Sequence, residues 1–187
     1  KLGLLTAPEE RLGHAAAPDM SLTENAMLTG SAREGLEKNG FMKWGLAKDF
    51  ADKIIEAFDV RTPGPENAAR SLSGGNLQKF IVGREIAAKP KLLIVSQPTW
   101  GVDVGAAAQI RAEILALRDA GCAVLVVSEE LEELFELSDR LHVIAKGRLS
   151  PSVARADATV ERIGEWMSGL WPVSKNNKAQ EAQHAAA

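Results

Sequence analysis

The sequence lacks the features that mark several specialised classes of protein. Its single cysteine, Cys122, excludes a disulfide framework and permits a reducing compartment. Because Cys122 lies in an apolar run, we expect a buried small side chain rather than a reactive thiol. Acidic residues outnumber basic ones by 25 to 22, and no basic stripe occurs, which argues against a nucleic-acid partner. No apolar run approaches the ~20 residues that a membrane helix needs, so any membrane role is expected to run through a partner.

Two further missing elements concern the start of the chain and phosphate binding. The 187 residues suffice for one domain or two small lobes. They include no initiator Met and no signal peptide, and the opening at Lys1 in mid-pattern predicts a fragment. The sequence also has no G-x-x-x-x-G-K-[ST] motif, the loop that holds the β- and γ-phosphates of ATP. We therefore expect this chain alone to bind ATP weakly or not at all.

The most informative stretch that is present is S-L-S-G-G-N-L-Q-K, at residues 71–79. Ser73 is of a type that caps helices, since its hydroxyl can accept a bond from a free amide of the first turn. Gly74 and Gly75 allow unusual backbone dihedrals and a close approach to a ligand. A helix that begins here presents free N–H groups and partial positive charge, which suit a phosphate. Three such residues alone more often form a simple helix cap, so that reading stays open.

Two apolar runs follow, and polar residues end each of them. Residues 91–99 predict a buried strand with a loop at its carboxyl end, and residues 122–127 predict another. A helix is expected between them at residues 106–119, and a further strand at 141–145. This alternation predicts βαβ units and a mainly parallel sheet. The polar residues at the carboxyl ends of these strands, where ligands bind in such sheets, are Ser96, Gln97 and Ser128.

These elements, in this order and spacing, resemble the ATP-binding subunits of ABC transporters. L-S-G-G-N at 72–76 is similar to the ABC signature, 92–97 to the Walker B strand and 100–103 to the D-loop, and 128–130 occupies the switch position. The residues at 71–79 are most similar to those in the second ATPase half of sugar and nucleoside import ATPases. The resemblance covers nearly the whole chain. It implies an α/β, partial P-loop ABC ATPase fold, with a mainly parallel sheet, flanking helices and a helical subdomain.

The resemblance also implies a division of the chain into four parts. These are a core remnant with a Q-loop-like segment at 1–13, a helical subdomain ending in the signature helix at 14–88, an α/β core lobe at 89–172, and a disordered tail at 173–187. Glu9 stands where the Q-loop glutamine is usual, although P-E-E-R also reads as a solvated charged turn. Within the helical part, S-L-T-E from Ser21 is a capping box, and 30–40 reads as a loop or frayed helix. Trp44 is expected in the core or on an exposed docking face.

Three positions depart from the active pattern of the family. Ser96 stands where the Walker B Asp holds Mg²⁺, and a hydroxyl is a much poorer partner for that ion. Gln97 stands at the catalytic Glu position, where an amide can orient a water but cannot take its proton. Glu129 stands at the switch position of a His, where a carboxylate would repel the γ-phosphate; a shift of one residue would place Glu130 there instead. We predict that this half's own site hydrolyses ATP poorly, and we assign it no metal ligand.

The signature, in contrast, is intact. Its residues are Ser73, Gly74, Gly75 and Asn76. In ABC pairs two halves meet head to tail, and each signature covers ATP held by the other half's P-loop. The resemblance therefore implies that Ser73 and the glycine amides contact the γ-phosphate in trans, with Asp103 of the D-loop at the same interface. ATP and Mg²⁺ would belong to the full assembly, with none bound to this chain. Trp100 departs from the small residue or Arg that is more usual in this loop.

Two functions follow from these expectations. In the first, the chain is part of the ATPase subunit of a sugar or nucleoside importer, held at the cytoplasmic face of the cell membrane by permease subunits. Its full-length parent would be an ATPase, and this chain alone would be inactive. In the second, it is a non-catalytic docking or regulatory module with the ABC shape. The intact signature favours the first and the changes at 96, 97 and 129 favour the second. A sheet without its P-loop strand and helix would expose an edge at which the chain could pair with itself.

Overall fold

The computed structural model describes residues 3–31 and 34–172 of the chain. The predicted disordered tail at 173–187 lies outside the described residues. Contacts between residues divide the chain into two compact units, which meet in the sequence at Glu133 and Leu134. Every residue predicted to belong to a functional site lies in the first unit. In the part of the chain that is described, no helix is both long enough and apolar enough to cross a membrane.

A three-stranded parallel sheet forms the centre of the first unit. Its strands are β1 (Leu4–Ala7), β4 (Leu92–Ser96) and β5 (Ala123–Val127), in the order β1-β4-β5. Neighbouring side chains of a strand point to opposite faces, so Leu93 and Val95 lie together on the buried face. Leu125, on the other face and on the outer strand, is exposed. The prediction of a mainly parallel sheet is confirmed.

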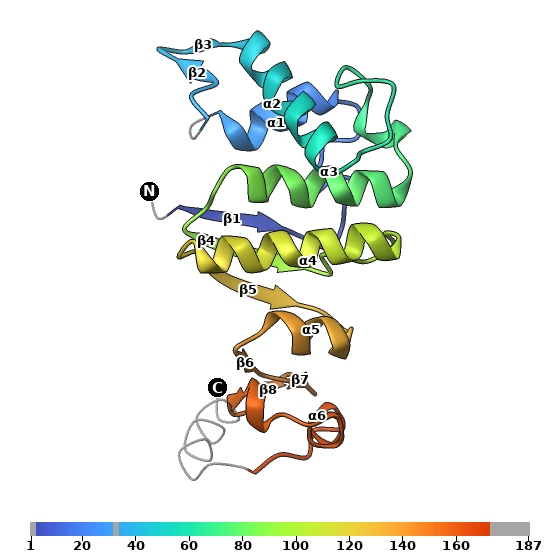
Figure 1. Cartoon of the computed structure of the whole chain (residues 1–187), viewed down its shortest axis with the longest axis vertical. Helices are drawn as coiled ribbons and strands as arrows, with labels where there is room; N and C mark the ends of the chain where they lie inside the picture. The colour runs from blue at the N-terminus through green and yellow to red at the C-terminus, as the bar shows by residue number, and fades with distance from the viewer. Residues whose placement is uncertain (1–2, 32–33, 173–187) are drawn as a thin grey trace, which may run out of the picture. The chain divides into compact units, whose positions relative to one another are not determined.

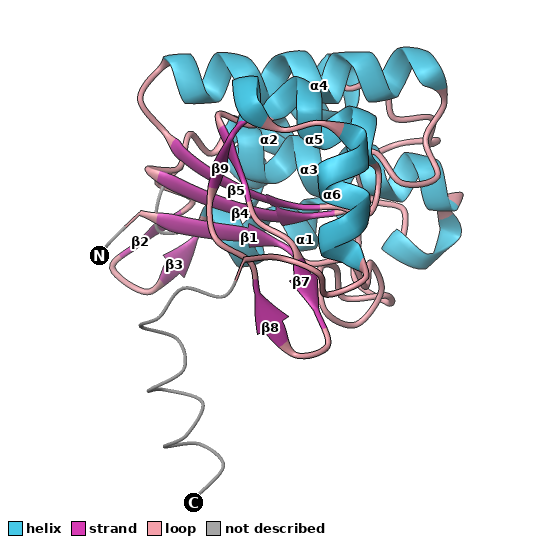
Figure 2. Cartoon of the chain, turned by 90° about the horizontal axis from the view of Figure 1, so that it is seen from below, coloured by secondary structure: helices cyan, strands magenta, loops and turns pink. Residues whose placement is uncertain are grey.

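The helices of the first unit are arranged in layers around this sheet. They are α1 (Leu22–Gly30), α2 (Trp44–Ala57), the 3-10 turn η1 (Ala69–Ser71), α3 (Gly74–Ala87), α4 (Val104–Asp119) and the start of α5 (Leu131–Leu137). Helices α3 and α4 pack against each other and cover one face of the sheet (Figure 2). Helices α1 and α2 pack together on the side of α3 that faces away from the sheet (Figure 1). The helix that carries the signature is therefore the middle layer.

The capping box predicted at Ser21 is present at the start of α1. The Ser21 hydroxyl accepts a hydrogen bond from the Glu24 amide at 3.1 Å, and the Glu24 carboxylate accepts one from the Ser21 amide at 2.7 Å. Two amides that the helix itself leaves unpaired thus gain acceptors. A cap of this kind typically stabilises its helix by about 1 kcal/mol.

The segment at 30–40 is neither a simple loop nor a frayed helix end. It contains strand β2 (Glu37–Lys38), which pairs antiparallel with β3 (Phe41–Met42). Asn39 and Gly40 join the two strands with positive φ angles of 55° and 82°. An Asn-Gly pair in the left-handed region is the preferred turn of a two-residue hairpin, so local turn chemistry explains this element.

The second unit consists of short antiparallel pairs and one helix. Its elements are β6 (Arg140–Leu141), β7 (Ile144–Ala145), β8 (Arg148–Leu149), β9 (Val153–Ala154), the 3-10 turn η2 (Arg155–Asp157) and α6 (Val160–Met167). The prediction of one strand over 141–145 is wrong, because the chain changes partner within it. Leu141 pairs with Val153, whereas Ile144 pairs with Leu149. The Ser150 hydroxyl accepts from the Val143 amide at 2.8 Å where the ladder is interrupted.

Candidate functional site

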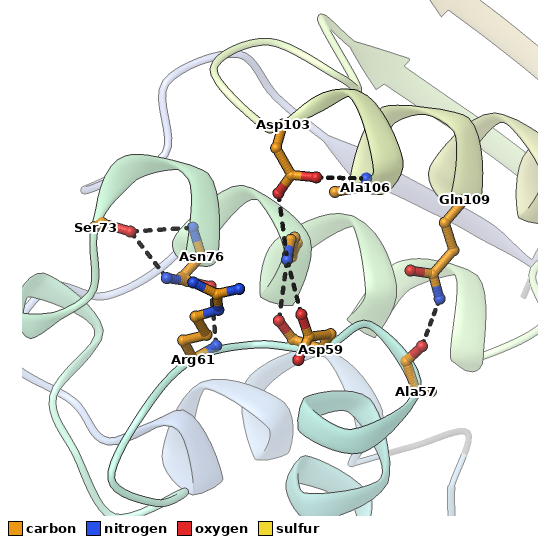
Figure 3. A network of polar contacts seen from close by, with 9 residues as sticks. Ala57, Asp59, Arg61, Ser73, Asn76, Asp103, Ala106 and Gln109 are labelled. Atoms are coloured by element: carbon orange, nitrogen blue, oxygen red, sulfur yellow. Dashed lines mark hydrogen bonds and ion pairs between the residues drawn. The ribbon is translucent and has the colours of Figure 1, made fainter.

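The signature turn opens helix α3 with Ser73 as its N-cap. The Ser73 backbone is extended, with φ −62° and ψ 154°, and its hydroxyl oxygen accepts from the Asn76 amide at 3.4 Å and from Asn76 Nδ2 at 2.9 Å (Figure 3). The Asn76 side-chain oxygen in turn accepts from the Arg61 amide at 2.9 Å. Both bonds at Ser73 use its oxygen as acceptor, and the residue is exposed. Its O–H hydrogen and the first amides of α3 can therefore donate to an anion from outside.

The two signature glycines allow a close internal approach. A Cβ at Gly75 would lie 2.8 Å from the backbone oxygen of Gly101, and a Cβ at Gly74 would lie 2.7 Å from Nη1 of Arg11. The start of α3 therefore packs directly against the loop that follows β4. From the sequence we expected these glycines to allow a ligand to approach. In the structure they also allow Gly101 and Arg11 of the same chain to lie close to the start of α3.

A buried lysine connects the signature helix to the start of α4. The Lys79 side chain is 7% exposed, and its Nζ donates to the Asp59 carbonyl at 3.0 Å and lies 3.8 Å from Oδ2 of Asp103. Asp103 caps α4 by accepting from the Ala106 amide at 2.9 Å. This amide hydrogen bond, together with the charge of Lys79, holds the pKa of the Asp103 carboxyl below its usual value. Lys79 thus links the helix that carries the predicted signature to Asp103 of the predicted D-loop.

The carboxyl ends of the three parallel strands meet at one edge of the sheet, as predicted. Gln97 directly follows β4 with a positive φ of 50°, and its amide donates to the Val127 carbonyl at 2.8 Å. Its side-chain oxygen accepts from the Ser128 hydroxyl at 3.3 Å. Ser96 is the last residue of β4 and pairs in register with Val127. Glu129, the residue after Ser128, is exposed.

Comparison with known proteins identifies relatives of this chain. No protein-family model matches the chain. The chain is 41% identical over 167 residues to the guanosine import ATP-binding protein NupO of Bacillus subtilis, a match that covers 89% of the chain and 33% of the relative. It is 41% identical over 162 residues to the nucleoside import ATP-binding protein NupA of Lactococcus lactis, over 87% of the chain and 32% of the relative. It is 35% identical over 192 residues to the ribose import ATP-binding protein RbsA 2 of Rhizobium etli, over 100% of the chain and 35% of the relative.

A comparison of structures gives the same fold. A dimeric ATP-binding cassette, MJ0796, in a state bound to ADP and Pi matches with a TM-score of 0.67 and 18% identity, over 81% of this chain and 62% of that one. This chain is a homologue of ABC import ATP-binding proteins. It spans about a third of the length of the relatives named above. The predicted resemblance and the predicted ABC ATPase fold are confirmed.

The ABC motifs expected from the sequence fall into two groups in the structure. The predicted signature residues lie at the start of α3, where Gly75 closely approaches Gly101 and Val102 of the predicted D-loop. The Walker B and switch positions lie at the carboxyl edge of the sheet, where β1 also ends shortly before Glu9. Among residues 3–31 and 34–172, no group of three or more His, Cys, Asp or Glu side chains is placed to hold a metal ion.

Three residues that contact the predicted site segments were not identified from the sequence. They are Arg11, Gln78 and Lys79, which contact the segment from Gln97 to Asp103. A lysine and a glutamine among the apolar residues of α3 were the only signal available, because polar side chains in a buried helix need partners. Their partners lie about 20 or more residues away in the sequence, so pattern alone could not name them.

Proposed function

We propose that this chain is part of the ATP-binding and hydrolysing subunit of an ABC importer for sugars or nucleosides, and that it supplies its signature in trans to a partner's ATP. The observation that carries the proposal is the signature turn. Ser73 is exposed and caps the start of α3, where the first helical amides have no acceptor within the helix itself. These donors fit the γ-phosphate of a nucleotide held by the P-loop of another ATPase half.

The chain's own ATP site is, in this proposal, degenerate. Ser96 replaces the carboxylate that would hold Mg²⁺, and Gln97 replaces the general base. The Gln97 side chain already accepts from Ser128, so it is held in place and can orient a water without taking its proton. Glu129 would repel the γ-phosphate from the switch position. ATP and Mg²⁺ therefore belong to the assembled protein, with catalysis at the partner's P-loop.

The proposed partners follow from the relatives. The related proteins are import ATP-binding proteins by name, and the matching solved cassettes are described as dimeric. We infer a head-to-tail pair with a second ATPase half, attached through permease subunits to the cytoplasmic face of the cell membrane. The exposed apolar residues of β5, such as Leu125, favour pairing of the chain with itself where no P-loop strand and helix cover them.

A non-catalytic docking or regulatory module is the second candidate function. Its supporting observation is that Ser96, Gln97 and Glu129 all depart from the active pattern in the same direction. Such a module would keep the ABC shape and use it only to hold partners. It would have no use for an exposed Ser73 or for open amides at the start of α3, and this favours the first function.

The deciding experiment substitutes Ser73 in the full-length protein assembled with its P-loop-bearing half. Ser73→Arg places a bulky side chain over the phosphate position and removes a donor, so we expect ATP turnover to fall by about 10²–10³-fold, as on loss of one oxyanion donor. Ser168→Arg, an exposed serine at the end of α6, is the matched control and should change turnover by less than about twofold. Unchanged turnover in Ser73→Arg would instead support the docking module.

A further inference from the structure

An arginine in the Q-loop-like segment bonds to both parts of the signature region. Arg11 Nε donates to the Gln78 side-chain oxygen at 2.9 Å, and Nη2 donates to the Trp100 carbonyl at 2.6 Å. The same guanidinium lies over the Trp100 ring, 5.1 Å from its centroid. Arg11 therefore joins three segments that are distant in the sequence: the loop after β1, helix α3 and the loop after β4.

Gln78 continues this connection through the interior. Its side chain is buried, and Nε2 donates to the carbonyls of Gln97 and Pro98, each at 3.0 Å. The side-chain oxygen is the acceptor used by Arg11, so the oxygen and the amide nitrogen of this group both have partners within the chain. Since a buried amide is costly to leave unpaired, these bonds fix the position of α3 relative to residues 97–98.

The signature itself leaves room for the guanidinium. A Cβ at Gly74 would come within 2.7 Å of Arg11 Nη1, and a Cβ at Gly101 within 3.1 Å of Nη2. The acceptors of Arg11, the Gln78 amide and the Trp100 carbonyl, are both neutral. Burial lowers the pKa of the guanidinium, in keeping with a cation held by directed hydrogen bonds in a partly desolvated position. A planar fork with fixed donors suits this role, and a lysine does not reproduce it.

We propose that Arg11 is a positioning residue that locks the signature turn of α3 to the loop that follows β4, from Gln97 into the D-loop segment at 100–103, so that Ser73 and Asp103 meet a partner as one rigid unit. The inference rests on the proposed function, because the position of Ser73 matters to turnover only if it contacts the partner's nucleotide. It assigns to the P-E-E-R segment a task separate from that of Glu9. It also gives Trp100 a structural role, as the aromatic face on which the guanidinium lies.

The first test separates geometry from charge in the full-length protein assembled with its P-loop-bearing half. Arg11→Lys keeps the positive charge but cannot bond Gln78 and the Trp100 carbonyl together. We expect kcat for ATP hydrolysis to fall about tenfold to a hundredfold, since small misplacements of a positioned group cost this much. KM for ATP should stay within about twofold, because the partner's P-loop supplies most of the binding. Arg118→Lys, another arginine that bonds through two nitrogens but at the far end of α4, should leave both constants unchanged.

A double-mutant cycle tests whether Arg11 acts through Gln78. Gln78→Met removes the same link from the other side, so it should lower kcat by a similar factor. If one connection is lost in both cases, Arg11→Lys with Gln78→Met should be no worse than the single variants. Losses that multiply would show two independent effects and overturn the inference. Circular dichroism melting of each variant verifies that the loss does not come from unfolding.

Trp100 provides a readout that a general loss of stability would not reproduce. The residue is 58% exposed although its ring stacks on Arg11. The emission that disappears in Trp100→Phe identifies its signal among those of the other tryptophans. In Arg11→Lys at a temperature well below melting, this signal should move to longer wavelength and become more open to iodide quenching. Emission that does not change would overturn the inference, as would changed emission with normal kcat.

The outcomes separate this inference from the function on which it rests. If Ser73→Arg abolishes turnover and Arg11→Lys leaves kcat unchanged, the positioning role is wrong and the proposed function stands. If Ser73→Arg has no effect, the proposed function fails and the inference fails with it. Loss of turnover in both variants, with the Trp100 signal shifted, supports both.

Discussion

Lys79 and Asp103 approach to 3.8 Å, Nζ to Oδ2, across the junction of α3 and α4. The two partners differ in exposure, since the lysine side chain is 7% exposed and the aspartate 71%. The same ammonium group also contacts the carbonyl and the carboxylate of Asp59, in the loop that follows α2. One cation thus connects the helical layer, the signature helix and the cap of α4. This contact therefore fixes the first two turns of α3, the helix that carries the predicted signature.

Replacing Lys79 should destabilise the protein more than replacing an exposed lysine in a comparable ion pair. In Lys79→Met the Asp59 carbonyl loses its charged donor and two carboxylates lose a cation, so we expect a loss of roughly 2 kcal/mol in the free energy of unfolding. Lys48→Met is the control, because Lys48 pairs with Asp52 within one exposed helix face at 2.7 Å. That pair should contribute about 0.5 kcal/mol or less. Urea unfolding compares the two, and equal losses would contradict the connecting role of Lys79.

The lowered pKa of the Asp103 carboxyl predicts a specific dependence of stability on pH. A carboxyl group whose pKa is depressed by folding adds stability above its unfolded pKa, about 3.9, and that stability disappears as the pH falls through the folded pKa. Asp103→Asn keeps a good N-cap and removes only the charge. We therefore expect the native protein to be more stable than Asp103→Asn at pH 7, and the difference to shrink below about pH 4. Urea unfolding of both proteins at several pH values measures it; a difference that is constant with pH would contradict the charge effect.

The elements that the sequence predicted well are those specified by local chemistry. The capping box at Ser21, the cap at Ser73 and the apolar run at 92–95 each act within a few residues, and each is present. The hairpin turn at Asn39 and Gly40 was equally local, but the strands on either side have only two residues and no alternating pattern. The single strand predicted over 141–145 failed for the opposite reason, since its apolar residues are continuous while its pairing partner changes.

The candidate site was predictable in its residue types but not in its connections. The signature, Walker B and switch positions could be assigned from order and spacing along the chain. The contacts that hold them, from Arg11 to Gln78 and from Lys79 to Asp103, bridge 67 and 24 positions of sequence. Such pairs depend on how α3 packs against the loop after β4. No period or motif contains that information, so only the folded chain identifies Arg11 and Lys79 as neighbours of the predicted site residues.

Adding a methyl group at Gly75 should destabilise the protein, whereas adding one at Gly45 should not. In Gly75→Ala the new Cβ would meet the Gly101 carbonyl oxygen at 2.8 Å, which forces α3 away from the D-loop segment. We expect a loss of about 1–3 kcal/mol, measured by thermal or urea unfolding. Gly45, in the first turn of α2, has open space around the same position, so Gly45→Ala should be neutral or stabilise by up to about 1 kcal/mol. If both substitutions stabilise the protein, the close approach at Gly75 is not what holds the turn.

Two substitutions that restore the usual carboxylates should increase ATP hydrolysis at the proposed degenerate site. In the full-length protein, with the partner's catalytic site inactivated, Ser96→Asp combined with Gln97→Glu should raise Mg²⁺-dependent ATP hydrolysis by at least tenfold, since a general base alone typically contributes about 10²–10⁴-fold. The acceptor bond from Ser128 would still be available to a carboxylate at position 97, so the new base would be held where the amide lies now. Gln109→Glu, a similar change on α4 outside this edge of the sheet, is the control and should give no gain. If the double variant also shows no gain in ATP hydrolysis, Ser96 and Gln97 are not the reason for low activity. The next residue to replace by the usual one is then Glu129, at the position of the switch His.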